Sequence, residues 1–279
     1  MSVLTRVPGF VRRFGEVARL SKRDIGVPLR GHLDGYVMQN GPVDTDNDIR
    51  FHSGQCSDST NKVIMTSTSN VVKQIDAPWA AGNDAGGFPT GITLTASTWY
   101  HTFVLGAGNR RDVDMGFDSA ITASNLLTSA SGYDVFRRVG SVKVGGATTI
   151  LGFTQIGNRF LWDTPILDIS LINTLGSTAR LDEISTPPDV KADAILNVFT
   201  NDAAVPYAVY ISNPGTTDVD VVASGVPGGN AGGANSFDTT QVIVSTNNNS
   251  RIRSRANATI DQYHVNTVGW IDPRGVSST

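Results

Sequence analysis

Residue types that could perform chemistry are present in this sequence, but they do not form a recognisable catalytic pattern. Asp44, Asp46 and Asp48 are spaced like the first ligands of a calcium-binding loop. The sixth position of that loop is Ile49, where glycine is needed, and the twelfth is Gln55, where a bidentate glutamate belongs. A solvated turn is therefore the favoured interpretation of this segment.

The sequence gives only a weak signal for a cofactor or nucleotide site. Gly106-Ala107-Gly108 has the first two glycines of a dinucleotide-binding loop, but Arg111 replaces the third, and a strand pattern follows instead of a helix. The chain has no Gly-x-Ser-x-Gly elbow and no phosphate-binding Gly-x4-Gly-Lys-Ser/Thr loop. We therefore expect no cofactor and no catalytic residue, although carboxylates are frequent and a glycosidase pair is not excluded.

Histidine, cysteine and tryptophan give no metal or redox signal. The histidines are scattered, and none pairs with another at metal-ligand spacing: His32, His52, His101 and His264. His101 lies within a strand pattern and is expected to be a structural group. The single Cys56 excludes an intramolecular disulfide and a cysteine-based zinc site, which favours folding in a reducing cytoplasm. Four tryptophans could stack on sugars, but core packing is the favoured role: Trp79, Trp99, Trp162 and Trp270.

One stripe of basic residues is a candidate binding surface. Arg251, Arg253 and Arg255 fall on one face of a predicted strand. Such a stripe could contact phosphate, or it could pair with the acidic body of a neighbouring subunit. We favour the second interpretation and expect no nucleic-acid partner.

The elements that would position these residues are short strands. Trp99–Leu105 is rich in aromatic and β-branched residues, a turn follows at 106–109, and Val113 and Met115 alternate with polar residues. Val135–Val144 and Thr148–Phe153 predict another hairpin. About a dozen such segments predict an all-β fold, an antiparallel β-sandwich or jelly-roll body over residues 41–279, with a break at 185–190 where the body could divide. Residues 79–91 and 225–233 are expected to be irregular loops.

The first 40 residues differ from this body. Residues 1–31 contain seven cations and two anions, a charge of +5, which leaves −8 for the rest of a chain whose net charge is −3. An apolar stripe at helical spacing predicts an amphipathic helix, flanked by three arginines. The expected interface residues are Val7, Phe10, Val11, Phe14 and Val17, with Arg12, Arg13 and Arg19. Residues 21–40 are expected to be an extended connector. The helix could pack on its own body or a sister subunit, dock into another protein, or bind an anionic membrane.

Several segments resemble a β-rich module of tailed-bacteriophage virion proteins, the tail fibres and spikes. The resemblance covers roughly Gly41 to the C-terminus and rests on Asp114–Asp118, Asn125–Leu127, Tyr133–Ser141, Phe153–Gln155, Phe160–Trp162, Thr246, Arg251–Arg255 and Thr267–Gly275. It implies a non-enzymatic structural protein, trimeric and fixed to the particle at one end. Residues 1–40 lie outside it.

The sequence and the resemblance together give one expectation of function and two alternatives. We expect a fibre or spike component of a phage virion, made in the bacterial cytoplasm and joined through residues 1–40 to other proteins of the tail, baseplate or head. A homotrimer and contact with a host surface glycan are expected with it. The alternatives are a carbohydrate-binding or carbohydrate-degrading β-sandwich protein, and a head decoration or spike protein.

Overall fold

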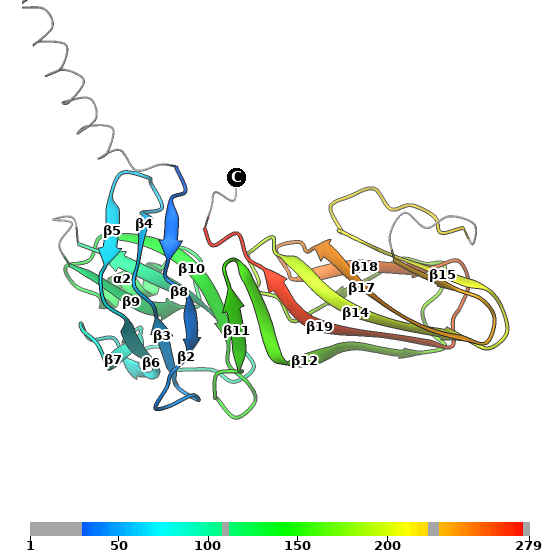
Figure 1. Cartoon of the computed structure of the whole chain (residues 1–279), viewed down its shortest axis with the longest axis horizontal. Helices are drawn as coiled ribbons and strands as arrows, with labels where there is room; N and C mark the ends of the chain where they lie inside the picture. Colours follow the sequence, from blue (N-terminus) through cyan, green and yellow to red (C-terminus); the bar gives the residue numbers. More distant parts are fainter. Residues whose placement is uncertain (1–29, 108–111, 223–228, 276–279) are drawn as a thin grey trace, which may run out of the picture.

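A computed structural model of the chain describes residues 30–107, 112–222 and 229–275 (Figure 1). Strands make up 53% of the residues and helix 3%, so the expected all-β class is confirmed. The predicted helix and its interface residues Val7 to Arg19 lie outside the described residues. No helix within the described ranges is long and apolar enough to cross a membrane.

The first half of the body surrounds one hydrophobic core, which we call the first core. Two three-stranded sheets and one arm of a nine-stranded sheet form its walls, in the orders β1-β4-β5, β10-β8-β9 and β11-β2-β3-β6-β7. The elements of this half are β1 Leu33–Gly35, β2 Met38–Asn40, β3 Asp48–Phe51, β4 Gly54–Ser57, β5 Ile64–Ser67, β6 Val71–Pro78, β7 Ala85–Phe88, β8 Trp99–Gly106, β9 Val113–Asp118, α2 Ser124–Ser129, β10 Val135–Lys143 and β11 Phe153–Ile156.

The second half, at the other end of the long axis in Figure 1, surrounds a second core. The remaining arm of the nine-stranded sheet, β17-β14-β19-β12, and a four-stranded sheet, β13-β18-β15-β16, both contribute side chains to it. The elements are β12 Arg159–Ile172, β13 Arg180–Glu183, β14 Asp193–Asp202, β15 Tyr207–Ser212, β16 Gly229–Gly232, β17 Ser236–Ser245, β18 Arg251–Ala256 and β19 Gln262–Ile271.

Two long strands join the halves. β12 places Phe160 in the first core and Ile169 in the second, and β19 places Trp270 in the first and Val265 in the second. The segment 185–190 does not separate the cores, because its last residue, Val190, packs into the first core, while Ile184 before the segment and Ala194 after it pack into the second. The chain therefore passes between the cores more than once.

The prediction that residues 21–40 form a connector is wrong for its last part. Leu33–Gly35 pairs with β4, and Met38–Asn40 pairs with β3. Tyr36, between them, is buried, and its hydroxyl donates to the Met65 carbonyl (3.2 Å) and accepts from the Ser67 amide (3.0 Å). The body thus begins before residue 41, because these short strands find partners that are distant in sequence.

Two segments that were predicted as irregular loops contain strands. β7 pairs in parallel with β6, and a Cβ at Gly86 would lie only 2.0 Å from the Pro78 carbonyl oxygen. Glycine is therefore required for the close approach of these two backbones. β16 pairs with β15, although its sequence is Gly-Asn-Ala-Gly. In both cases the glycines that suggested a loop permit close strand contact.

An aromatic cluster fills the first core where the two halves meet. Trp270 stacks on Phe160, with ring centroids 5.0 Å apart and planes at 6°. Trp162 lies 5.0 Å from Trp270 at a tilted angle, and Trp99 meets it edge-on at 5.4 Å. Three of the four tryptophans thus have the predicted packing role, and Trp79 packs against Tyr133 at 5.4 Å.

Replacing Trp270 with Ala should lower the free energy of unfolding by about 3–5 kcal/mol, because it removes the ring at the centre of this cluster and leaves a cavity. Urea denaturation followed by circular dichroism measures the change. Val43→Ala is the control, since Val43 is 95% exposed and its loss should change little. Equal stability of the Trp270 variant and the wild type would contradict this account of the core.

Candidate functional site

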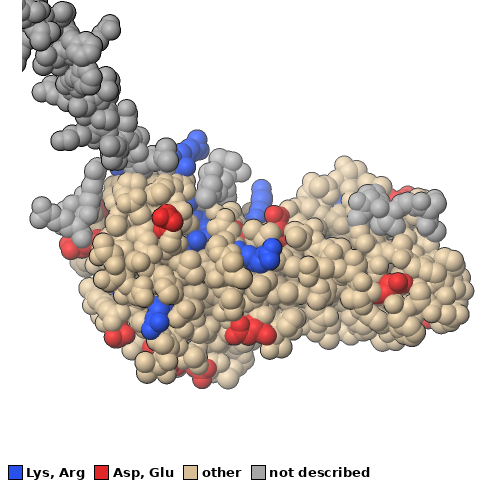
Figure 2. Space-filling view, in the orientation of Figure 1, with Lys and Arg blue, Asp and Glu red and all other residues tan. Residues whose placement is uncertain are grey.

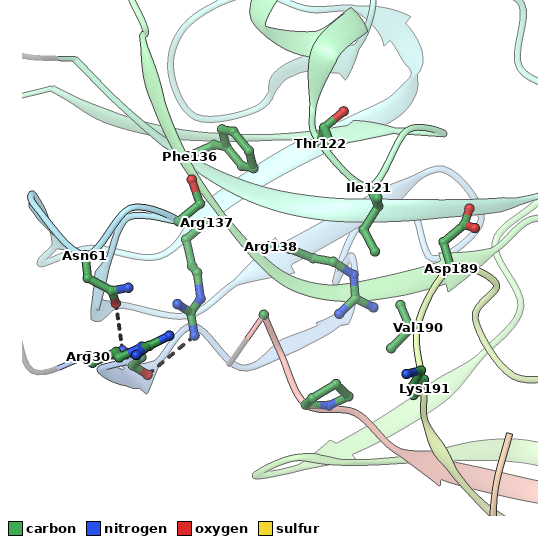
Figure 3. Close-up of a pocket in the computed structure, with 14 residues that line it drawn as sticks. Arg30, Asn61, Ile121, Thr122, Phe136, Arg137, Arg138, Asp189, Val190 and Lys191 are labelled. Atoms are coloured by element: carbon green, nitrogen blue, oxygen red, sulfur yellow. Dashed lines mark hydrogen bonds between the residues drawn. The ribbon is translucent and has the colours of Figure 1, made fainter. Parts of the chain in front are cut away.

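An open cavity of about 720 Å³ lies beside the first and last described residues of the chain (Figure 3). We call it the junction pocket. Four cationic residues line it, Arg30, Arg137, Arg138 and Lys191, together with apolar side chains that include Ile121, Phe136, Val190 and Pro273. Asp189 is the carboxylate among the lining residues. The wall is therefore cationic and apolar.

Arg138, which lines the pocket, is paired with the fully buried Asp272. Nη1 and Nη2 of Arg138 each donate to one oxygen of Asp272 at 2.7 Å, a bidentate pair between β10 and the residue after β19. Both groups are almost fully buried. Burial opposes ionisation of Asp272, but the charge of Arg138 and the hydrogen bonds from Arg138, the Arg274 amide and Trp270 outweigh it and lower the pKa of that carboxyl.

Arg137 and Arg274 hold together the two ends of the described chain. Arg274 donates from Nε to the Val139 carbonyl (2.8 Å) and from Nη2 to the carbonyls of Gly35 and Tyr36. Arg137 donates from Nε to the Arg274 carbonyl (3.1 Å) and from Nη2 to the Gly31 carbonyl (3.4 Å), the contact drawn in Figure 3. Burial lowers the pKa of Arg274 to about 10, which leaves the group charged at neutral pH.

His101 lies behind the pocket wall as a neutral structural group. Its Nδ1 accepts from Arg138 Nε at 3.2 Å and lies 2.8 Å from the Ser141 hydroxyl, so the ring proton is on Nε2. Burial, and then the charge of Arg138, lowers the pKa of His101 to about 3, against the opposing effect of Asp272. The expectation that His101 is a satisfied structural residue is confirmed.

The charges of this arrangement favour anions. Three buried guanidinium groups lie near two buried carboxylates, Asp272 and Asp58, and backbone carbonyls accept hydrogen bonds from Arg137 and Arg274. Burial raises the pKa of the Cys56 thiol to about 12, so this cysteine stays protonated and unreactive. Across residues 30–107, 112–222 and 229–275, no group of three or more His, Cys, Asp or Glu side chains could hold a metal ion.

A second cavity, of about 440 Å³, includes two carboxylates, Asp46 and Asp163. Both are exposed to solvent. The general acid of a glycosidase is typically a desolvated carboxyl group, whereas these two carboxyl groups are open to water.

The other sequence-based candidates have structural roles where the structure describes them. Asp44 accepts from the amides of Asp46 (2.9 Å) and Asn47 (3.0 Å), which confirms a turn in place of a calcium loop. The dinucleotide hypothesis concerns Gly108 and Arg111, which lie outside the described residues.

The arginine stripe was predicted to pair with a neighbouring subunit, and this is wrong for two of its members. Arg255 pairs with Asp218 (3.1 Å) and Asp220 (2.8 Å) of its own chain. Arg253 donates to the Pro214 carbonyl (2.7 Å) and to a second carbonyl in the same loop. The stripe fastens the loop after β15 to β18, because that loop lies next to it in space.

The residues of the junction pocket were not predicted from the sequence as a functional site. A signal was present, because Arg137 and Arg138 interrupt an apolar strand between Phe136 and Val139. Charged residues inside such a pattern need buried partners. The partners Asp272 and Arg274 are more than 130 residues away, so the pairing is visible only in the structure.

Comparisons with known proteins gave no match that shows a family. No family model matches the sequence, and no curated protein matches it. A Bacillus thuringiensis Cry1Da tryptic core variant aligns with 10% identity and a TM-score of 0.17. That alignment covers 89% of this chain and 54% of the Cry1Da chain, so the chain spans about half of its length. A TM-score this low carries no argument about fold or function.

Asp272→Asn should destabilise the body by about 3–5 kcal/mol, because it leaves the buried Arg138 without its counter-charge. Chemical denaturation at pH 7 measures the loss. Asp220→Asn is the matched control: Asp220 is 88% exposed, and its pair with Arg255 is a surface pair of small effect. Equal losses of free energy of unfolding in the two variants would contradict the claim that burial makes the Arg138–Asp272 pair more stabilising than a surface pair.

Stability should fall as the pH drops from about 6.5 towards 3. The folded pKa of His101, about 3, is below the usual value of about 6.5, so over this interval the unfolded chain binds a proton that the folded chain does not. The contribution of His101 is complete above about pH 6.5 and decreases by up to about 1.4 kcal/mol per pH unit below it. Denaturation at pH 7 and pH 5 should show a smaller loss for His101→Gln than for the wild type; equal losses would refute a neutral His101.

Proposed function

We propose that this chain is a non-enzymatic structural component of a tailed-bacteriophage virion, of the fibre or spike type, displayed from the particle by its N-terminal segment. One observation carries the proposal. Residues 30–31 and 273–275 meet at the junction pocket, where Arg137 donates to the carbonyls of both Gly31 and Arg274, and the second half of the body extends away from this place (Figure 1). A body attached next to the pocket presents its second half outward.

The attachment segment in this proposal precedes residue 30, because Leu33–Asn40 belongs to the body. Its apolar stripe would bury against another virion protein, and its arginines would orient the docking. The protein would assemble as a homotrimer on the tail, baseplate or head, after synthesis in the host cytoplasm. A sandwich or jelly-roll architecture suits the second half, where side chains from two sheets meet in one core.

An enzymatic role in glycan degradation is the less favoured alternative. The junction pocket has one lining carboxylate, and the carboxylates of the second cavity are exposed. Glycoside hydrolysis needs a pair of opposed carboxyl groups in a site that raises the pKa of one of them. Glycan binding without hydrolysis is compatible with display. A head decoration protein would use the same anchored geometry.

Deleting residues 1–29 should leave a folded body that no longer joins the particle. The described strands remain intact, so circular dichroism and the melting temperature should match those of the full chain. Phe10→Ser combined with Phe14→Ser should have the same effect on incorporation, because it removes two apolar contacts. Mass spectrometry of purified particles measures the amount of chain.

Deletion of residues 1–40 is the contrasting variant. It also removes β1, β2 and the buried Tyr36 and Met38, so it should unfold the first half. Incorporation of the 1–29 deletion at the wild-type level would show that the body makes the attachment and would overturn this part of the proposal.

A further inference from the structure

The outer face of β17, β14, β19 and β12, on the side opposite the second core, has an unusual composition. Strand register places residues in four rows, each crossing the four strands in that order. We call these residues the outer grid. The rows are Phe237–Asn201–Gln262–Ile172, Thr239–Phe199–His264–Ser170, Gln241–Asn197–Asn266–Leu167 and Ile243–Ile195–Gly269–Leu161.

The outer grid contains no Asp, Glu, Lys or Arg. The next row towards the first half, Ser245–Asp193–Ile271–Arg159, brings charge back to the same face. Figure 2 shows charged side chains mainly over the first half and few over the second on the visible side. A face without charge offers no electrostatic attraction to an acidic or a basic partner.

The uncharged polar groups of the outer grid are mostly carboxamides. Five of its members are Asn or Gln: Asn197, Asn201, Gln241, Gln262 and Asn266. One hydrogen bond links two of them, from Gln241 Nε2 to Asn197 Oδ1 at 3.1 Å. Asn201 is 8% exposed, and its side chain has no hydrogen-bond partner among the described residues. A carboxamide in this state has both a donor and an acceptor to offer, and a hydroxyl group can satisfy either.

Aromatic rings lie beside these amides. Phe199 stacks on His264, with centroids 5.6 Å apart and planes at 26°, and lies 6.3 Å from Phe237. The Phe237 ring is 72% exposed. The negative face of an aromatic ring attracts the C–H groups on the apolar face of a sugar. Rings next to carboxamides therefore match both surfaces of a carbohydrate.

We propose that the outer grid binds a neutral glycan. The proposal rests on the function above, in which the second half is presented outward to a host surface. Phe237 packs on the apolar face of a sugar unit, and Asn201, Gln262 and Gln241 exchange hydrogen bonds with its hydroxyls. Binding is non-covalent, and no bond of the glycan is broken.

The size of the outer grid favours a glycan over a second copy of this chain. Four strands about 4.8 Å apart and seven residues of about 3.3 Å each span an area of about 14 by 20 Å, or roughly 300 Å². A stable protein interface takes about 800 Å² from each partner, so the outer grid alone is well below that size. Covering it with protein would also bury its carboxamide groups. Each of them would then need a hydrogen-bond partner on the covering protein, because a buried polar group without a partner costs free energy.

The test uses the full-length chain on a microarray of bacterial surface glycans, neutral and acidic. We expect binding to at least one class of neutral glycan and none that requires acidic sugars. Phe237→Ala should weaken binding about tenfold or more, and Gln241→Ala should also weaken it. Both positions are exposed, so folding should be retained. Val43→Ala, an exposed apolar side chain in the first half, should bind like the wild type.

The other outcomes overturn either this inference or the virion proposal, and they distinguish the two. Binding to no neutral glycan refutes it, as does binding that Phe237→Ala leaves unchanged. Self-association that Phe237→Ala abolishes, measured by light scattering without glycan, assigns the face to a second copy. A chain that enters particles but binds no glycan refutes this inference alone. A chain that binds neutral glycan but is absent from particles refutes the virion proposal and leaves the glycan site standing.

Discussion

The fold depends on the buried pair between Arg138 and Asp272. These residues are 134 positions apart, and their two hydrogen bonds fix the end of β19 against β10. A buried guanidinium group without a counter-charge costs free energy. Arg138 of β10 therefore gains its partner only when Asp272, the residue after β19, is in place. Because β19 also carries Trp270 into the first core and Val265 into the second, the pair links the formation of both cores.

This arrangement places β19, the last strand among the described residues, inside the nine-stranded sheet and not at its edge. β19 lies between β12 and β14 and is hydrogen-bonded to both, although each lies far from it in sequence. The arm β17-β14-β19-β12 is therefore incomplete until residues 262–271 have joined it. Non-local pairings of this kind slow folding, because the loops between the strands must close before contacts compensate for the lost entropy.

Local sequence patterns predicted the strands that have a clear apolar pattern of their own. They failed for strands that form only because they pair with another strand. β8, β14 and β19 have aromatic and β-branched residues at alternating or continuous buried positions, so their existence was predictable. The glycines of β7 and β16 suggest loops to any local criterion, yet they permit close pairing with β6 and β15. The junction pocket was not predictable, because its charges balance only across more than 130 residues.

Charge is distributed unequally between the two ends of the body, and this separates two kinds of recognition. At the junction pocket the three buried guanidinium groups outnumber the two buried carboxylates, Asp272 and Asp58, so the local field favours anionic groups and acts over a distance. On the outer grid no charge is present, and recognition there depends on hydrogen-bond geometry and ring contacts that act only at close range. An electrostatic pocket beside residues 30–31 and 273–275 suits the docking orientation that the proposed attachment needs. An uncharged face on the other half suits a neutral ligand whose binding is insensitive to salt. The fold keeps these two surfaces apart by building each half around its own core.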